Sequence, residues 1–470
     1  MEKDRLPLTT KAAVGYSAAS FTDAGLYNFI FMFLLYFLTD YARIGPAFAG
    51  TIILVATLCD IIITPVVSQI SDNSRAKSRR RSFIKIAAIP IFIVFVLLFT
   101  TFDMGEGAKN AYYMILTVLF WIVFGTFVVP YYALAPELTD VQEERTKLRM
   151  PVVLFQAGGN IMGMVAPMAV MTWLVASGVS ANMSWTVYAI IFGGMSAVAL
   201  FVTYFTTKGR EIEGDRLQRD GKPENVFLVY GRMCALKPAR TMLSITAIYN
   251  LAYGFILSGM TYFILYNVVN GKESDVSIVT AVMTVILFVF TPVICSIAVK
   301  KERSFVLGAC LFISAAAMLI LFAIGIHTLP TLIVCMVLFE IANVAYWSIV
   351  QAMFYDLTEV YEYKYGKRME GAACGINIVI MKVFMAISLQ IFGIILEAGG
   401  YDPAAAAQTD AALKMIGICF IVIPAIMFVI TGVVSLRVPI TTKNYPLLLR
   451  ALEAKRAGQE HSTEGLEKVL

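Results

Sequence analysis

The sequence predicts an all-α integral membrane protein whose twelve transmembrane helices form two pseudo-symmetric six-helix bundles. Three observations support this prediction. Apolar residues make up 59% of the 470-residue chain and charged residues 15%, against roughly 45–50% and about 25% in soluble domains. Twelve charge-poor apolar runs reach about 20 residues, the length that crosses a hydrocarbon core of roughly 30 Å. A charged phrase also occurs twice, once in each half of the chain.

The apolar runs are expected to be helices, because a strand in lipid needs a closed barrel whose strands alternate in polarity. These runs do not alternate. They cover 12–38, 46–70, 83–102, 110–133, 151–176 and 184–206, then 241–268, 276–299, 304–325, 330–356, 371–398 and 412–436. We therefore predict an N-terminal bundle at 1–206, a cytoplasmic linker at 207–240, a C-terminal bundle at 241–436 and a cytoplasmic tail at 437–470.

The distribution of Lys and Arg predicts the orientation of the chain. With a cytoplasmic N-terminus, 32 of the 37 basic residues fall on the cytoplasmic side and four fall outside, which leaves Lys382 inside a helix. We expect a multi-pass protein of the cell membrane with both termini in the cytoplasm. A basic inner surface that faces anionic lipid accounts for the net charge of +5, so membrane lipids are expected partners and nucleic acid is not.

The repeated phrase relates the two halves of the chain. "ELTDVQEERTKLRM" begins at Glu137 and "DLTEVYEYKYGKRM" begins at Asp356, an offset of 219 residues that places one copy after the fourth run and the other after the tenth. A parallel repeat of two six-helix bundles is the architecture of major facilitator transporters. Acidic and basic side chains of the two phrases are expected to pair when the inner side closes; the alternative is that they are solvated loop charges. The gating candidates are Glu137, Asp140, Arg145, Asp356, Glu359 and Arg368.

Other features of the sequence speak against enzymatic chemistry. The two histidines, His327 and His461, do not form an HExxH motif, and the chain has neither GxSxG nor GxxxxGK[ST]. The seven cysteines lack CxxC spacing and are interpreted as packing residues. The first apolar run is too long for a secretory signal, so we expect no cleavage. We predict a protein that is not an enzyme and needs no cofactor.

Charged residues inside apolar runs predict where ions and substrate bind, because each costs about 2.5–3.5 kcal/mol at mid-helix. These residues are Asp23, Asp60, Glu340 and Lys382. Three acids and one base cannot neutralise one another by pairing, which suggests coupling to a cation or a proton. Thr57 and Thr64 share a helical face with Asp60, although hydroxyls of this kind also bond back to their own helix. The cation-coupling candidates are therefore Asp60, Thr64, Thr57 and Glu340.

Aromatic and polar side chains near these acids suit a sugar, which presents apolar ring faces and many hydroxyls. The candidates are Tyr27, Asn28, Tyr132, Gln156, Asn160, Tyr249, Asn250, Trp347, Gln351 and Asn377. Trp347 ranks higher because it follows Glu340 by seven residues and so lies on roughly the same helical face. Gly158, Gly159 and Gly163 in "AGGNIMG" predict a close contact between helices and not a ligand loop.

These stretches resemble the glycoside–pentoside–hexuronide:cation symporter family of the major facilitator superfamily. The resemblance spans nearly the whole chain and is carried by "SFTDAGLYNFIFMFLLYFLTD", "SDNSRAKSRRRSF", "PYYALAPELTDVQEERTKL", "YDLTEVYEYKYGKRMEG" and "GIILEAGGYDP". It implies that Asp23, Tyr132, Trp347 and Lys382 match positions of the sugar site. It also implies that Asp60 matches a carboxylate of the cation site.

The chain departs from the family pattern at several positions. Thr64 stands where members that use Na⁺ commonly have a second carboxylate, and Val128 stands where a second substrate-binding acid is expected. Val152 or Val153 replaces an arginine, with Arg149 nearby, and Glu340 is an addition. These changes speak against melibiose-like galactosides as substrates. The missing carboxylate weakens a Na⁺ site at Asp60 and makes proton coupling there at least as good a hypothesis.

We expect a secondary symporter that imports a glycoside or related sugar together with H⁺ or Na⁺, and that works as a monomer. The predicted substrate-binding residues are Asp23, Tyr27, Asn28, Tyr132, Gln156, Trp347, Gln351 and Lys382. Two alternatives remain at this point. The first is a major facilitator carrier of another substrate, such as a lysolipid, and the second is a membrane sensor that transports nothing.

Overall fold

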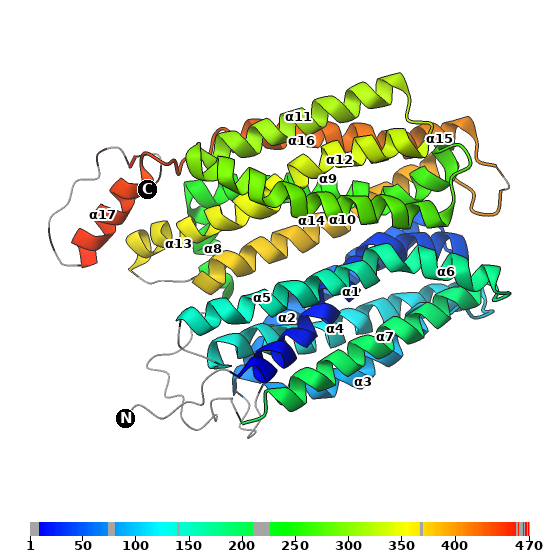
Figure 1. The fold of residues 1–470 in the computed structure, drawn as a ribbon, viewed down its shortest axis with the longest axis horizontal. Coiled ribbons are helices and arrows are strands. Elements are labelled where there is room, and N and C mark those ends of the chain that lie inside the picture. The colour runs from blue at the N-terminus through cyan, green and yellow to red at the C-terminus, as the bar shows by residue number, and fades with distance from the viewer. Residues whose placement is uncertain are drawn as a thin grey trace. The chain divides into compact units, whose positions relative to one another are not determined.

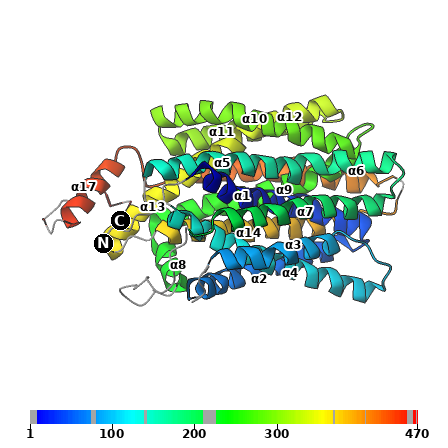
Figure 2. The same cartoon turned by 60° about the horizontal axis from the view of Figure 1, so that its bottom comes forward.

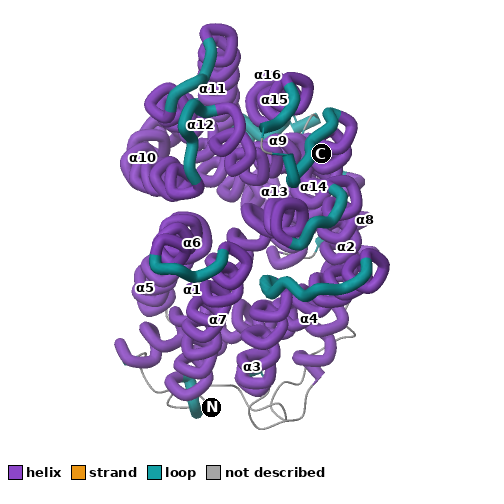
Figure 3. The backbone as a smooth tube through the Cα atoms, turned by 90° about the vertical axis from the view of Figure 1, so that its right-hand side faces the viewer, coloured by secondary structure: helices purple, strands orange, loops and turns teal. Residues whose placement is uncertain are grey.

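A computed structural model of the chain describes residues 9–73, 80–138, 142–209, 226–366, 370–405 and 407–456, together with residues 459, 464, 466, 467 and 469. Every regular element in this part of the chain is a helix (Figure 3). Twelve helices among the described residues are long and apolar enough to cross a membrane. The predicted all-α class and the predicted number of transmembrane helices are therefore confirmed.

Two compact units make up the fold, and the first holds most of the N-terminal half. Unit 1 comprises Met1–Lys222, Lys272–Ile278 and Asp402–Ala406. Its helices are α1 (Thr10–Tyr36), α2 (Pro46–Asn73), α3 (Arg81–Leu98), α4 (Glu106–Leu138), α5 (Gln142–Asn160), α6 (Ala166–Ala176) and α7 (Ala181–Thr206), with π-helical turns η1 (Phe37–Tyr41) and η2 (Ile161–Val165). Within this unit α1 packs on α5 and α7, and α4 packs on α2 and α3 (Figures 1 and 2).

An aromatic cluster forms much of the core of unit 1. The ring of Phe29, on α1, lies 4.9–6.3 Å from five other rings: Phe95 on α3, Phe99 directly after α3, and Trp185, Tyr188 and Phe192 on α7. All six side chains are buried. Contacts between aromatic rings add to the free energy gained by burial, so this cluster holds α1 against α3 and α7.

Glycines bring the backbones of α1 and α5 together. A Cβ at Gly159 would lie 2.3 Å from the carbonyl oxygen of Phe21, and a Cβ at Gly163 would lie 2.3 Å from the carbonyl oxygen of Gly25. Only glycine fits at such distances, because any side chain would overlap the backbone of α1. The predicted close contact is confirmed, and it fixes the segment of α1 that carries Asp23.

Unit 2 comprises Pro223–Gly271, Val279–Tyr401 and Ala407–Leu470. Its helices are α8 (Val226–Ala235), α9 (Lys237–Asn267), α10 (Glu273–Lys300, whose first residues belong to unit 1), α11 (Arg303–Ile324), α12 (Leu329–Ala345), α13 (Gln351–Tyr365), α14 (Glu370–Ala398), α15 (Asp410–Gly417), α16 (Ile423–Ser435) and α17 (Tyr445–Arg456). Two further π-helical turns are η4 (Tyr346–Val350) and η5 (Ile418–Val422). Helix α8 lies inside the stretch 207–240, which the sequence predicts to be a linker.

Helix α9 occupies the centre of unit 2, since most of its apolar length is buried. It packs against α14 on one side and α16 on another, and α16 in turn packs on α11, which contacts α12. The apolar part of this core includes Phe339, Phe428, Phe263 and Phe420, all of them buried. Helix α17 follows the last transmembrane helix and packs on α13 (Figure 1).

Candidate functional site

Asp23 and Tyr132, predicted separately from the sequence, meet in unit 1. The hydroxyl of Tyr132, on α4, donates a 2.5 Å hydrogen bond to Oδ2 of Asp23, on α1. Tyr132 remains 48% exposed, whereas its neighbour Tyr131 is 1% exposed and stacks on Tyr16 with ring centroids 4.6 Å apart. The Tyr16–Tyr131 stack therefore fixes α4 so that Tyr132 reaches the carboxylate. A carboxylate beside an exposed phenol suits a ligand rich in hydroxyls.

The other predicted sugar-site residues of unit 1 lie close to this pair along α1 and α5. Asn28 donates a 2.8 Å hydrogen bond from Nδ2 to Oδ1 of Asn160. Asn28 follows Asp23 by five residues, which is about 7.5 Å along the helix axis. Gln156 precedes Asn160 by about one turn of α5 and is half-buried. Tyr27, one turn after Asp23, contacts Trp121 edge-on with centroids 6.0 Å apart.

Asp60, on α2, is 1% exposed, and one of its two predicted hydroxyl partners bonds to it. The hydroxyl of Thr64 donates a 3.1 Å hydrogen bond to Oδ1 of Asp60. Thr57 instead donates to the carbonyl of Ile53, one turn back on its own helix, at 2.8 Å. Thr57 therefore makes the back-bond that the sequence left as an alternative. A buried carboxylate with a hydroxyl neighbour can hold a proton or contribute oxygen to a small cation.

Gly125, on α4, faces the Asp60–Thr64 pair. A Cβ at this position would lie 3.4 Å from Oδ1 of Asp60 and 3.4 Å from Oγ1 of Thr64. The absence of a side chain leaves room in front of both oxygens. Gly125 could not be predicted as part of this site, because nothing in the sequence tells which α4 residue lies opposite Asp60.

The predicted substrate-binding residues of unit 2 are partly exposed. Trp347 is 37% exposed and lies in the π-helical turn η4, a type of irregularity that is frequent at functional sites. Its ring packs edge-on against buried Tyr346, with centroids 5.4 Å apart. Gln351, which begins α13, and Lys382, on α14, are half-buried. All three side chains therefore remain candidates for contact with substrate.

Tyr249, Asn250 and Asn377, which are also candidates for the sugar site, are buried in unit 2. Their exposed fractions are 0%, 0% and 1%. Tyr249 donates to Oδ1 of Asn343 at 2.8 Å, Asn250 donates to the hydroxyl of Tyr346 at 2.7 Å, and Asn377 accepts from Thr246 at 2.7 Å. Their polar groups bond to other buried side chains of unit 2, and none of the three side chains faces solvent in this structure.

Glu340 belongs to the same buried network, in unit 2, whereas the other cation-coupling candidates lie in unit 1. It is 2% exposed, and its Oε2 accepts a 3.0 Å hydrogen bond from Nδ2 of Asn343. The structure therefore describes two buried carboxyl groups with separate surroundings. The network residues Asn343 and Tyr346 escaped the sequence analysis; their spacing of three and six residues from Glu340 was the available signal.

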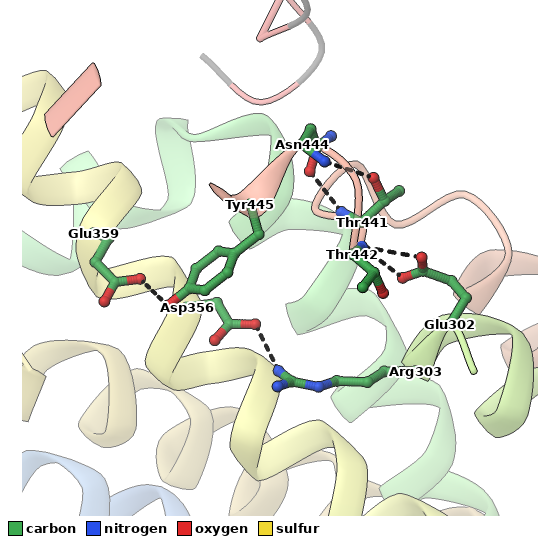
Figure 4. Close-up of polar contacts among 8 residues, drawn as sticks. All are labelled: Glu302, Arg303, Asp356, Glu359, Thr441, Thr442, Asn444 and Tyr445. Carbon is green, nitrogen blue, oxygen red and sulfur yellow. Dashed lines mark hydrogen bonds and ion pairs between the residues drawn. The ribbon is translucent and has the colours of Figure 1, made fainter. Parts of the chain in front are cut away.

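The second charged phrase finds partners within unit 2 (Figure 4). Asp356 pairs with Arg303, at the start of α11, at 2.9 Å, and Glu359 accepts a 2.6 Å hydrogen bond from Tyr445 of α17. Burial and the bond to Glu359 raise the pKa of Tyr445, so the phenol stays protonated and acts as the donor. Among the other gating candidates, Asp140, Arg368 and the side chains of Glu137 and Arg145 lie outside the described residues.

The segment after the last transmembrane helix makes further contacts with unit 2. Both carboxylate oxygens of Glu302 accept hydrogen bonds from the N–H of Thr442, at 3.2 and 3.0 Å (Figure 4). Arg456 donates two hydrogen bonds to Glu362, at 2.8 and 2.7 Å. The acidic residues of the second phrase and its surroundings therefore bind the C-terminal segment, which the sequence analysis did not foresee.

Comparison with known proteins places these residues in context. A model of the family described as MFS/sugar transport protein matches residues 13–442. The isoprimeverose transporter of Lactiplantibacillus pentosus is 24% identical over 94% of this chain and 91% of its own. The putative glycoside/cation symporter YagG of Escherichia coli (strain K12) is 23% identical over 96% of each chain. The glucuronide carrier protein homolog of the same organism is 23% identical over 96% of this chain and 97% of its own.

Solved structures agree on the fold. The inward open conformation of the xylose transporter XylE from E. coli superposes with a TM-score of 0.59, at 14% identity, over 96% of this chain and 98% of that chain. A mutant of the peptide transporter POT gives a TM-score of 0.64 at 10% identity, over 94% and 95% of the two chains. At these identities the likeness concerns the arrangement of helices alone.

Proposed function

Because this chain belongs to the MFS/sugar transport protein family, we propose that it is a secondary active symporter that imports a glycoside or related sugar together with H⁺ or Na⁺ by alternating access. One observation in the structure carries this proposal. Unit 1 holds two intramembrane carboxylates in different surroundings, with Asp23 beside the exposed phenol of Tyr132 and Asp60 buried beside Thr64. Two such groups allow one to meet the sugar and the other to meet the cation.

Asp23 and Tyr132 bind sugar hydroxyls in this proposal. A carboxylate can accept hydrogen bonds from two hydroxyls, and bonds of this charge-assisted kind contribute roughly 1.5–3 kcal/mol each. Asn28, Asn160 and Gln156 extend the polar surface along α1 and α5. Within unit 2, the sequence-predicted sugar residues are Trp347, Gln351 and Lys382; an indole ring suits a sugar face, and an ammonium group suits the carboxylate of a uronide. The names of the relatives, which mention isoprimeverose, glycosides and glucuronide, are consistent with such substrates.

Asp60 is the coupling group in this proposal. Asp60 supplies a carboxylate and Thr64 supplies a hydroxyl. Gly125, which faces both oxygens, has no side chain to cover them. A proton needs only the carboxylate, whereas Na⁺ needs further oxygen ligands. A carboxylate beside a hydroxyl can take either ion, so the imposed gradients described below decide between H⁺ and Na⁺. We also propose that the protein is a monomer in the cell membrane with both termini in the cytoplasm, as the distribution of basic residues indicates.

The experiment measures uptake and exchange of sugar in proteoliposomes that contain purified protein. A panel of neutral glycosides, uronides and lysolipids identifies the substrate, and an imposed H⁺ or Na⁺ gradient identifies the ion. We expect Asp60→Asn to abolish accumulation against a gradient and to keep exchange between equal concentrations, because exchange does not require the cation to cycle. Asp103→Asn, outside the helices of unit 1, is the control and should behave as wild type. Undiminished accumulation by Asp60→Asn, or transport of lysolipid alone, would refute the proposal.

A further inference from the structure

Glu340 has no role in the proposed sugar and cation sites, and its surroundings are those of a group that exchanges a proton. It is 2% exposed in a helix that spans the membrane. Its one hydrogen bond in the structure comes from the neutral amide of Asn343, at 3.0 Å, and no basic side chain among the described residues pairs with it. An ionised carboxylate is costly in such a place unless it is paired.

We propose that Glu340 is a proton-binding site of unit 2 whose protonation changes the packing of α12 against α9. The inference deepens the proposed function, and it rests on that function in assigning the proton to sugar transport. The reaction is the addition of one proton to a carboxylate oxygen of Glu340 and its later release. No other covalent bond forms or breaks.

The hydrogen bonds around Glu340 run from helix to helix. Asn343 donates to Glu340 with its amide nitrogen and accepts from Tyr249, on α9, with its amide oxygen. The ring of Tyr249 stacks on Tyr346 with centroids 3.6 Å apart, and Tyr346 accepts from Asn250 at 2.7 Å. Each side chain in this network is at most 4% exposed. A change in one group must therefore be accommodated by the next, since water is not at hand to replace a lost bond.

Protonation reverses the direction of the first bonds. A carboxylate only accepts hydrogen bonds, so the amide of Asn343 must present its nitrogen to Glu340. A protonated carboxyl can donate, and the amide can then turn to accept with its oxygen. The amide nitrogen would face Tyr249, whose hydroxyl must then accept instead of donate. The state of Glu340 is in this way passed to α9, the central helix of unit 2.

The network also contains an unused acceptor. Oδ1 of Asn250 is buried and has no hydrogen-bond partner among the described residues. A buried polar atom without a hydrogen bond costs about 1–3 kcal/mol. A second arrangement of the network that gives Oδ1 of Asn250 a partner can therefore compete in free energy with the observed arrangement. On the far side of Asn250, Thr246 donates to Oδ1 of Asn377 at 2.7 Å. The network thus extends to α14, five residues before Lys382.

The groups that the neighbouring helices place around Glu340 suit the binding of a proton there and not the binding of a metal ion. The titratable groups that face Glu340 are Tyr249 and Tyr253 from α9, and Tyr346 lies in the turn that follows α12. Helix α11 contributes Cys310 and, at its first turn, Arg303, which pairs with Asp356. The basic residues of α9, Lys237 and Arg240, are at least nine residues from Tyr249, or about 13 Å along the axis. Hard cations prefer several oxygen ligands, and the amide oxygen of Asn343 is already bound to Tyr249.

The test uses the full-length protein in liposomes and two readouts. Infrared difference spectra against pH detect the C=O stretch of a protonated carboxyl, and sugar exchange against pH detects the coupling. We expect Glu340→Gln to remove one pH-dependent carboxyl band. We also expect the rate of sugar exchange in this variant to lose part of its dependence on pH. Glu340→Asp should keep a pH-dependent carboxyl band, shifted in frequency because the group is now an aspartic acid, and should keep the pH dependence of exchange. The matched control is Glu397→Gln, which neutralises an exposed glutamate of α14 and should leave both readouts unchanged.

A third variant separates proton binding from its transmission. Tyr249→Phe keeps the carboxyl but removes the hydroxyl that bonds to Asn343, so the infrared band should persist while the pH dependence of exchange weakens. If Glu340→Gln does not insert, the shift of the band in Glu340→Asp identifies the group instead. The inference is overturned if neither Glu340 variant alters any carboxyl band, or if exchange keeps its wild-type pH profile in Glu340→Gln. Failure of wild-type protein to exchange any sugar would instead refute the proposed function, and the band would still decide whether Glu340 binds a proton.

Discussion

Replacement of Gly159 by alanine should separate α1 from α5 and weaken sugar binding. The new methyl carbon would lie 2.3 Å from the carbonyl oxygen of Phe21 and 3.1 Å from the backbone nitrogen of Gly25. Non-bonded heavy atoms prefer separations of about 3.5–4.0 Å, so α1 must move by roughly 1 Å. Because both contacts are backbone atoms, no change of rotamer relieves the overlap.

The expected loss of stability follows from this overlap. Overpacking of this kind costs about 1–3 kcal/mol, and a loss of 2 kcal/mol lowers the unfolding temperature of a unit of this size by about 4–8 °C. Gly158→Ala is the matched control, because its methyl group would lie 3.7 Å from the ring of Phe21, an ordinary contact. Thermal unfolding of the two purified variants in detergent, followed by intrinsic fluorescence, measures the difference.

Sugar binding supplies an independent measurement. Asp23 lies between Phe21 and Gly25, the two α1 residues that contact the glycines of α5 and η2. A shift of α1 by about 1 Å changes the distance between Asp23 and Tyr132, whose hydrogen bond of 2.5 Å requires a closely fixed geometry. Gly159→Ala should therefore bind sugar more weakly than Gly158→Ala does. Equal unfolding temperatures, or equal sugar affinities, in the two variants would show that the close contact does not position Asp23.

Three further predictions address the remaining parts of the site. Asp23→Ala and Trp347→Ala should each lower sugar affinity at least about tenfold, the effect of 1.4 kcal/mol, in equilibrium binding to purified protein; wild-type affinity in both would place the sugar elsewhere. Charge reversal at Arg145 should slow exchange more than it weakens binding if this residue acts in gating, whereas a change in affinity alone would make it a binding residue. Glu362→Arg should release the C-terminal segment to protease, and the added change Arg456→Glu should restore protection, because the double variant reforms the pair with its charges exchanged; protection that is not restored would exclude the ion pair as the anchor.

The transmembrane helices could be predicted from the sequence because lipid leaves a chain few choices. Every backbone polar group must be satisfied within the membrane, so long apolar runs are helices. The close contact at Gly159 was predictable for a similar reason, since small residues at helical spacing allow backbones to approach. Asp23 and Asp60 could be selected because a charged residue in such a run costs free energy and usually has a function. In each of these cases a single residue or a short run contains the whole signal.

Polar side chains without charge could not be sorted in the same way. Tyr249 and Tyr132 look alike in the sequence, yet one is 0% exposed and the other 48%. What separates them is the rotation of each helix and the identity of the residue across from it, Asn343 for Tyr249 and Asp23 for Tyr132. Such partners are 94 and 109 residues apart in the chain. No local pattern records a pairing over that distance, and the contacts between α17 and α13 escaped prediction for the same reason.

The three intramembrane acids differ in what surrounds them, and this difference divides the proposed roles among them. Asp23 is half-buried and bonds to an exposed phenol, so a solute that arrives from water can exchange places with that bond. Asp60 is 1% exposed beside a hydroxyl and a glycine, surroundings in which a carboxylate can meet a proton or a bare cation. Glu340 is buried inside a hydrogen-bonded network in which the amide nitrogen of Asn343, and not its oxygen, faces the carboxyl group. A metal cation would need further oxygen ligands there, whereas a proton needs none. If coupling used Asp60 alone, neutralising Glu340 would leave the pH profile of exchange unchanged; two protonatable sites, one in each unit, predict that each neutralised variant loses a different part of that profile.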